Sequence, residues 1–210
     1  MPKSRIKIQR GVVLPRIERR RDGSIWVIAI EGEKTEKLYF QKFGSTKIHV
    51  EIIPTLSGDS AEPEGVIERL RKYKRDNDLD EADKCWLVVD VDHRTDERLK
   101  TVCAQAKEER FQVAISNPCF EFWLFLHKFE ADELNQSIHQ LALEQRSAEM
   151  KQILQYDYKS LSYSEFCSDV KRAIQRARTK ESSRRSDIPK FPGTDVYKVV
   201  ESLPVKTIED

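Results

Sequence analysis

Three acidic residues stand directly after two apolar stretches of the sequence. Glu31 follows the stretch 25–30. Asp90 follows the stretch 85–89, and Asp92 comes two residues later. Each stretch has the length and composition of a strand that is covered on both faces of a parallel sheet. Because side chains at the carboxyl ends of such strands converge on the ligand-binding edge, the sequence predicts that three carboxylates meet there.

Grouped carboxylates favour a hard cation at this edge. Two like charges about 4 Å apart repel by ~4 kcal/mol at an effective dielectric constant of about 20, so a positive partner is expected. Mg²⁺, with Mn²⁺ as its substitute, takes one or two carboxylates and completes its shell with water and phosphate oxygens. We therefore predict that Glu31, Asp90 and Asp92 are both catalytic groups and metal ligands, and that the substrate carries phosphate. The alternative is that Asp90 and Asp92 merely begin a solvated loop.

Further candidate residues flank these acids. Gly32 precedes the first expected helix, so free N–H groups could face a phosphate there, and Thr35 could add a hydroxyl contact. Glu36 lies one helical turn further on and could bind a second metal or support the first. Glu121 is a lone acid in the apolar segment 120–126. It is either a further metal ligand or a residue that forms an ion pair or charges the start of a helix.

The elements that must position these residues alternate along the chain. Strands are expected at 24–30, 47–53, 85–89 and 111–116, and helices at 33–43, 66–73, 96–110, 120–126 and 196–203. This alternation predicts an α/β fold with a mostly parallel sheet flanked by helices. The expected organisation is a basic arm at 1–22, an α/β core at 23–130, and a helical C-terminal extension at 131–210 packed on the core.

The charge balance means that attraction to nucleic acid must be local. The 210 residues contain 37 Lys and Arg against 36 Asp and Glu, which leaves a net charge of +1. Candidate phosphate contacts lie in two basic clusters, which include Arg19, Arg20 and Arg21 in the first, and Arg176, Arg178, Lys180, Arg184, Arg185 and Lys190 in or beside the second. The alternative is that these clusters are solvated faces or docking surfaces for a protein.

Other features place the chain in the cytoplasm. No apolar run approaches the roughly 18 residues that cross a bilayer, so no membrane partner is expected. The four cysteines are widely spaced, which fits a reduced compartment and disfavours a structural zinc site. His93 and His127 are expected to be structural rather than catalytic.

Four blocks of the sequence together resemble the RloB-like family. They are EGEKTEKLYF at 31–40, DVD at 90–92, SNP at 116–118 with FEFW at 120–123, and TDVYK at 194–198. The resemblance runs from about residue 10 to residue 205 and implies a Toprim-like Rossmannoid fold. It also implies a bacterial defence context with an ATPase partner.

The resemblance assigns roles to individual residues. It implies that Glu31 is the general acid/base and that Asp90 and Asp92 bind metal. Glu36 lies five positions after Glu31, one more than the corresponding acid in the related overcoming-lysogenization-defect nucleases. The catalytic lysine of those relatives has no clear match, and Lys159 and Lys190 are the candidates.

The expected function is metal-dependent hydrolysis of phosphodiester bonds in DNA or RNA. The main alternative is a non-catalytic Toprim subunit that binds nucleic acid or the ATPase. A receiver-like phosphorylation switch fits less well, because it usually has an acidic pair where this chain has Glu31-Gly32. Homo-oligomers are possible. The candidate docking surface for the ATPase is the segment 131–183. It offers the apolar residues Leu134, Ile138, Leu141, Ile153 and Leu154. The alternative is that these residues pack on their own domain.

Overall fold

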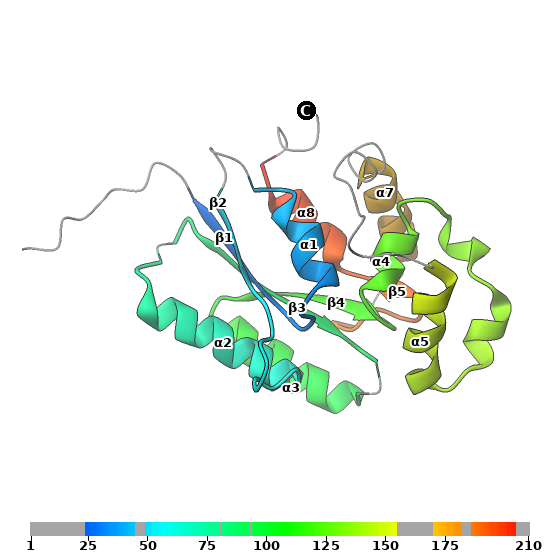
Figure 1. Ribbon diagram of the computed structural model, residues 1–210, viewed down its shortest axis with the longest axis horizontal. Helices are drawn as coiled ribbons and strands as arrows, with labels where there is room; N and C mark the ends of the chain where they lie inside the picture. The colour runs from blue at the N-terminus through cyan, green and yellow to red at the C-terminus, as the bar shows by residue number, and fades with distance from the viewer. Residues whose placement is uncertain are drawn as a thin grey trace, which may run out of the picture.

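The centre of the molecule is a five-stranded sheet in the order β2-β1-β3-β4-β5 (Figure 1). The computed structural model describes residues 24–44, 49–79, 81–92, 94–154, 170–181 and 186–204. The strands are β1 (Ile25–Ile30), β2 (His49–Ile53), β3 (Lys84–Asp90), β4 (Gln112–Asn117) and β5 (Gly193–Thr194). The first four run parallel, and β5 runs antiparallel to β4. The predicted α/β fold class, a mostly parallel sheet flanked by helices, is confirmed.

Helices cover both faces of this sheet. They are α1 (Thr35–Gln41), α2 (Pro63–Asp76), α3 (Asp96–Glu108), α4 (Glu121–Phe125), α5 (Leu143–Leu154), α7 (Val170–Glu181) and α8 (Val196–Ser202), with 3-10 turns η1 (Ala131–Glu133) and η2 (Gln136–Gln140). Figure 1 shows α2 and α3 on one face, and α1, α4 and α8 on the other, with α5 beside α4. Helix α2 begins at Pro63, where a missing N–H costs nothing, and buries Val66, Ile67 and Leu70.

The two faces of the sheet bury two hydrophobic cores. In β1, Val27 and Ala29 belong to the core under α2 and α3, whereas Ile28 and Ile30 belong to the core on the opposite face. Successive side chains of a strand point to opposite faces, so a strand between two cores must be apolar at every position. This requirement explains the unbroken apolar run that marked β1 in the sequence.

The apolar residues predicted to dock a partner in the C-terminal extension belong to the core on the face of the sheet opposite α2 and α3. Ile138 is fully buried and Leu134 is 3% exposed. The others, Leu141, Ile153 and Leu154, are partly buried against the same core. A charge at Ile138 would be buried without a partner and would unfold the domain before it tested an interface. These side chains therefore pack on their own domain, and the prediction that they form a docking surface is wrong.

The sequence analysis missed β5, which lies inside the expected helical extension. Gly193 pairs with Asn117 and Thr194 pairs with Ser116. The hydroxyl groups of Ser116 and Thr194 form a buried hydrogen bond of 2.9 Å, and the N–H of Asp195 donates to the carbonyl of Ile115 at 2.8 Å. A two-residue strand leaves no alternating pattern to recognise. Its effect is to fasten the extension to the carboxyl end of β4.

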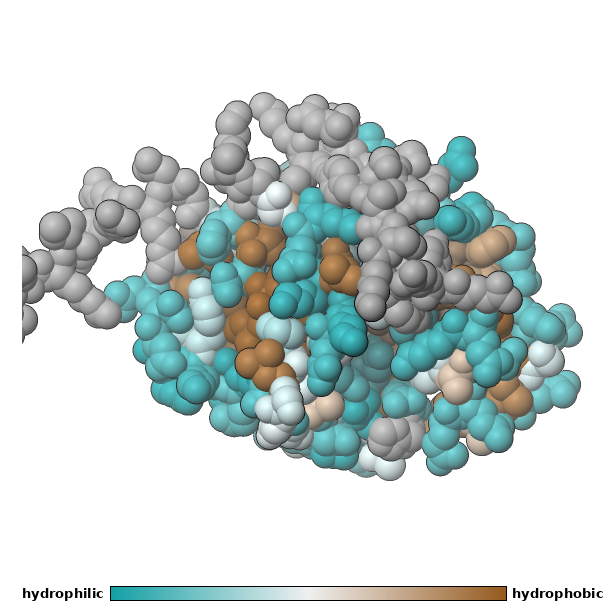
Figure 2. Space-filling model, viewed as in Figure 1, coloured by the Kyte–Doolittle hydropathy of each residue, from teal (hydrophilic) through white to brown (hydrophobic). Residues whose placement is uncertain are grey.

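The visible surface of the molecule is mostly hydrophilic. Figure 2 shows hydrophobic residues gathered beside α1, over β1 and β2. Strand β2 is at the edge of the sheet, and its Val50 and Ile52 are only partly buried. Among the helices of the described ranges, none combines the length and the apolar character that a membrane span requires.

Candidate functional site

A pocket of about 430 Å³ opens at the carboxyl ends of β1 and β3. Its described lining consists of Glu31, Gly32, Glu33, Lys34, Thr35, Glu36, Ala61, Asp90, Asp92, Cys119, Glu121, Ser147 and Lys151. All five residues predicted as metal ligands are present in this lining. Strands β1 and β3 are parallel neighbours, so their carboxyl ends lie at the same edge and bring together acids about sixty positions apart in the sequence.

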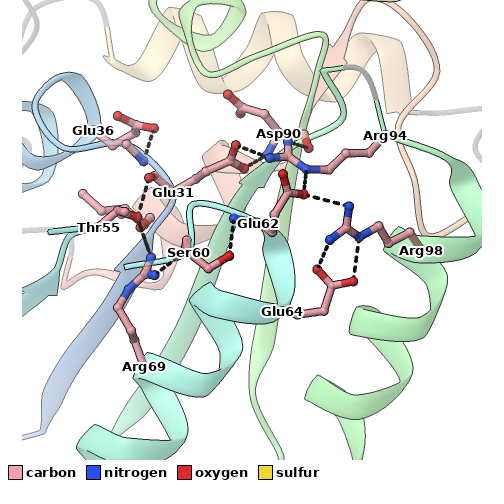
Figure 3. Close-up of polar contacts among 12 residues, drawn as sticks. Glu31, Glu36, Thr55, Ser60, Glu62, Glu64, Arg69, Asp90, Arg94 and Arg98 are labelled. Atoms are coloured by element: carbon pink, nitrogen blue, oxygen red, sulfur yellow. Dashed lines mark hydrogen bonds and ion pairs between the residues drawn. The ribbon is translucent and has the colours of Figure 1, made fainter. Parts of the chain in front are cut away.

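Glu31 is fixed at the end of β1 by contacts on both carboxylate oxygens (Figure 3). Its Oε1 accepts a hydrogen bond from Nη2 of Arg94 at 2.7 Å, and its Oε2 accepts one from the N–H of Asp90 at 3.1 Å. The hydroxyl of Thr55 donates to the carbonyl of Glu31 at 2.6 Å. Burial raises the pKa of Glu31, although Arg94 and the Asp90 N–H act in the opposite direction. The carboxylate is therefore oriented and half-buried.

Glu36 folds back over Gly32. Glu36 is only 7% exposed, and its Oε1 accepts a hydrogen bond from the Gly32 N–H at 3.0 Å. Burial, reinforced by Glu121 and Glu31, raises the pKa of Glu36 to about 7. The Gly32 N–H was expected to be free for phosphate, and this expectation is wrong because Glu36 accepts its hydrogen bond. Thr35 lines the pocket at 9% exposure.

Gly32→Ala is expected to displace Glu36. A Cβ at Gly32 would lie 2.1 Å from Oε2 of Glu36, so the carboxylate would have to leave the Gly32 N–H. Since the displaced group is the end of a flexible side chain, we expect a loss of about 1.5 kcal/mol in the free energy of unfolding, the lower end of the scale of one hydrogen bond to a charged group. Chemical denaturation measures this loss, with Gly44→Ala as the control.

Among the described residues, nothing lies closer than 3.7 Å to a Cβ added at Gly44, so its substitution tests the general cost of adding a methyl group beside α1. Equal stability losses in the two variants would show that the contact between Glu36 and Gly32 contributes nothing of its own.

Asp90 and Asp92 occupy the end of β3 and the turn that follows it. Asp90 is the last residue of the strand and is half-buried. Asp92 has a φ of 42°, a left-handed conformation that Asp tolerates, and its N–H donates to the carbonyl of Pro118 at 2.9 Å. Burial, followed by the charges of Glu31, Glu36 and Glu121, raises the pKa of Asp90 well above its usual range. Asp90 is thus part of a crowded acidic site and not a solvated loop start.

Glu121 faces the same pocket from the first residue of α4. It is 5% exposed. The neighbouring Cys119 is 1% exposed, and burial together with the nearby Glu121 and Asp90 raises the pKa of its thiol well above the usual value. Glu121 therefore adds negative charge to the site formed by the strand ends.

Sequence reasoning missed two pocket residues on α5, Ser147 and Lys151. They are four positions apart and so lie on one face of the helix. Partial desolvation lowers the pKa of Lys151, but the charges of Glu121, Cys119, Asp90 and Asp92 outweigh it and the net shift is upward. A Ser and a Lys in a polar helical segment carry no distinctive pattern, so only the fold reveals them.

Sequence reasoning also missed the arginines that hold the walls of the site. Arg94 is 6% exposed; besides Glu31 it binds Glu62 through Nε at 3.2 Å and the Asp90 carbonyl through Nη1 at 3.2 Å. Arg69 donates to the carbonyl of Ile30 at 3.0 Å and to the Thr55 hydroxyl at 2.6 Å. Figure 3 shows these two side chains approaching the end of β1 from opposite sides.

Several predicted residues lie elsewhere. Lys190 is exposed and is not part of the described pocket lining. His127 is a core residue, as expected; it is 1% exposed, lies 3.2 Å from the Tyr39 hydroxyl, and burial lowers its pKa to about 4. The remaining candidates fall outside the described residues: Arg19, Arg20, Arg21, His93, Lys159, Arg184 and Arg185.

The described part of the second basic cluster is paired with acids. Arg176 contacts Glu130 at 2.7 Å, Arg178 contacts Glu201 at 2.6 Å and Lys180 contacts Asp132 at 2.5 Å. Such pairing reduces the positive charge that this surface offers to phosphates. For these three residues it favours the alternative of a solvated, ion-paired face.

The chemistry of the pocket suits Mg²⁺. Its donors are carboxylate oxygens, which hard cations prefer, and burial and mutual repulsion raise the pKa of Glu31, Glu36 and Asp90. Within the ranges that the structure describes, no three His, Cys, Asp or Glu side chains are grouped tightly enough to hold a metal as they stand. Mg²⁺ does not need such a cage, because one or two carboxylates and several waters suffice.

Comparison with known proteins gives one match. A family model described as RloB-like protein matches residues 26–203, which is the greater part of the chain. No curated protein and no solved structure matches it significantly.

Proposed function

Since the chain belongs to the RloB-like family, we propose that it is a metal-dependent nuclease that hydrolyses phosphodiester bonds in DNA or RNA. The observation that carries this proposal is the convergence of Glu31, Asp90 and Asp92, with Glu36 and Glu121, on one pocket at the carboxyl ends of β1 and β3. Such a concentration of acids is unfavourable on its own and becomes useful when a divalent cation and a phosphate are bound.

Each residue has a role in this proposal. Asp90 and Asp92 would hold Mg²⁺, while Glu36 and Glu121 would hold a second ion or support the first. When bound, Mg²⁺ lowers the pKa of a coordinated water and offsets charge on the phosphate. Glu31 would accept the proton of the attacking water, because its carboxylate is oriented by Arg94 and the Asp90 N–H at the pocket wall.

The setting of the reaction is also part of the proposal. The family resemblance supports a role in bacterial defence with an ATPase partner, inside the cytoplasm. The second candidate function, a non-catalytic subunit that binds nucleic acid or the ATPase, is favoured by the pairing of Glu31 with Arg94, which would have to loosen before Glu31 could bind metal.

Two measurements on the full chain separate the candidates. Calorimetry should show Mg²⁺ and Mn²⁺ binding, and protein incubated with plasmid DNA, single-stranded DNA or RNA should cleave one of them, alone or with its ATPase partner. Chelation of the metal should stop cleavage. Metal binding without cleavage of any substrate under either condition would identify the non-catalytic subunit, and absence of metal binding would refute both the metal site and the nuclease.

A further inference from the structure

The charge of the pocket raises a problem for any phosphate that enters it. Its described lining carries six acidic residues against two lysines, Lys34 and Lys151. Repulsion between a phosphate and a carboxylate about 4 Å away amounts to ~4 kcal/mol at an effective dielectric constant of about 20. A bound metal offsets part of this repulsion, but the phosphate oxygens that point away from the metal need partners of their own.

Helix α5 supplies two side chains suited to such oxygens. Ser147 and Lys151 are four residues apart on the face of the helix that lines the pocket. Contacts between α4 and α5 place this face beside Glu121 and Cys119. Lysine is a compact cation with three donors, and a serine hydroxyl can donate one further hydrogen bond, so together they match two oxygens of a phosphate.

The Ser147 hydroxyl is the more informative of the two. The residue is 6% exposed, and within the described part of the chain its Oγ has no hydrogen-bond partner. Buried hydroxyls are nearly always hydrogen-bonded, because leaving one unsatisfied costs about 1–3 kcal/mol. An unsatisfied hydroxyl at the wall of a polar pocket indicates that its partner is a ligand.

The Ser147 hydroxyl makes no hydrogen bond that holds α5 in place within the described residues. An alanine at 147 would leave no donor unsatisfied, and the other buried residue of the helix is the apolar Met150. The hydroxyl is thus explained by what enters the pocket and not by the packing of the helix.

We propose that Ser147 and Lys151 form a phosphate subsite that binds the non-bridging oxygens of the phosphodiester on the α5 side of the pocket. This inference rests on the proposed function, which gives the pocket its phosphate substrate. It makes the C-terminal extension part of the binding site and not only a cover for the sheet. Both residues bind and position the substrate.

Inorganic phosphate is the probe that tests this subsite. Calorimetry should follow phosphate binding to the full chain with and without saturating Mg²⁺, in the wild type and in Ser147→Ala, Lys151→Met and Lys151→Arg. We expect phosphate affinity to fall at least about tenfold in Lys151→Met, several-fold in Ser147→Ala, and least in Lys151→Arg, which keeps the charge. Lys72→Met removes an exposed lysine from α2 and is the matched control.

Mn²⁺ affinity, measured separately, distinguishes this inference from the proposed function. Loss of Lys151 removes a positive charge near the acids, so Mn²⁺ should bind as tightly as before or more tightly. If Mn²⁺ binds and Lys151→Met binds phosphate like the wild type, the subsite is wrong and the metal site stands. If Mn²⁺ does not bind, the proposed function fails, and the subsite survives only if phosphate still binds and Lys151→Met abolishes that binding. Thermal unfolding confirms that each variant is folded.

Discussion

Asp90→Asn should reduce the proposed metal-dependent phosphodiester hydrolysis about a hundredfold to a thousandfold, the scale of losing a group that stabilises the charge of a transition state. Asn has the shape of Asp and lacks its charge, so the substitution removes the proposed metal ligand without opening a cavity. Initial rates of cleavage in Mg²⁺ and in Mn²⁺ measure the effect, together with Mn²⁺ affinity by calorimetry.

The same substitution should not weaken the fold. Burial and the neighbouring acids raise the pKa of Asp90 above its value in the unfolded chain. A carboxyl whose pKa is raised by folding favours the folded state when protonated and opposes it once pH exceeds the unfolded value. At neutral pH the neutral Asn should therefore leave stability unchanged or increase it.

A matched variant shows whether the loss of activity is local. Asp76→Asn removes an exposed carboxylate from the end of α2 and should cleave like the wild type. Should Asp90→Asn retain the wild-type rate with normal Mn²⁺ affinity, Asp90 would not be a metal ligand, and the assignment of the whole acidic edge would have to be abandoned.

Arg94→Met should lower the free energy of unfolding by about 3 kcal/mol in the absence of metal, the lower end of the scale of breaking a buried ion pair from one side. The guanidinium group bridges Glu31 and Glu62, and its side chain is 3% exposed against 15% for Glu31. Without it Glu31 would lose its cationic partner, and its pKa, which Arg94 now lowers, should rise further. Urea denaturation at neutral pH measures the change.

Arg98→Met is the natural control for this experiment. Arg98 binds Glu62 at 2.8 Å and Glu64 at 2.7 Å, but its side chain is 41% exposed, so its ion pairs are screened by water. We expect no measurable change in stability for Arg98→Met. If Arg94→Met also unfolds at the wild-type urea concentration, the contact between Arg94 and Glu31 does not hold the site together.

The sheet and its acidic edge could be predicted from the sequence because both leave strong local signals. Strands β1 and β3 lie between two cores, so β1 and residues 85–89 of β3 are apolar at every position, and Glu31 and Asp90 stand where these runs stop. The general rule that parallel strands present their carboxyl ends at one edge then brings the acids together. No knowledge of the loops was needed for this step.

The remaining parts of the site depend on contacts that sequence spacing does not encode. Arg94 looks like any polar residue of a loop, and its burial follows from its contacts with the distant Glu31 and Glu62. Likewise Ser147 and Lys151 reach the pocket because α5 packs against α4. In each case the partner lies far along the chain, so hydrophobic periodicity, which is a local property, carries no information about the pairing.

Residues before and after position 130 pack into one hydrophobic core, which limits how the chain can be divided into fragments. Trp26 and Ile28 of β1 lie in the same hydrophobic cluster as Ile138, Met150 and Val199. A fragment that ended near residue 130 would lose α8 from one face of its sheet and would lack β5 at the edge of β4. The acidic edge is consequently not a module that can be excised or grafted onto another scaffold by itself. Engineering of this protein has to treat the strands and the C-terminal helices as one folding unit.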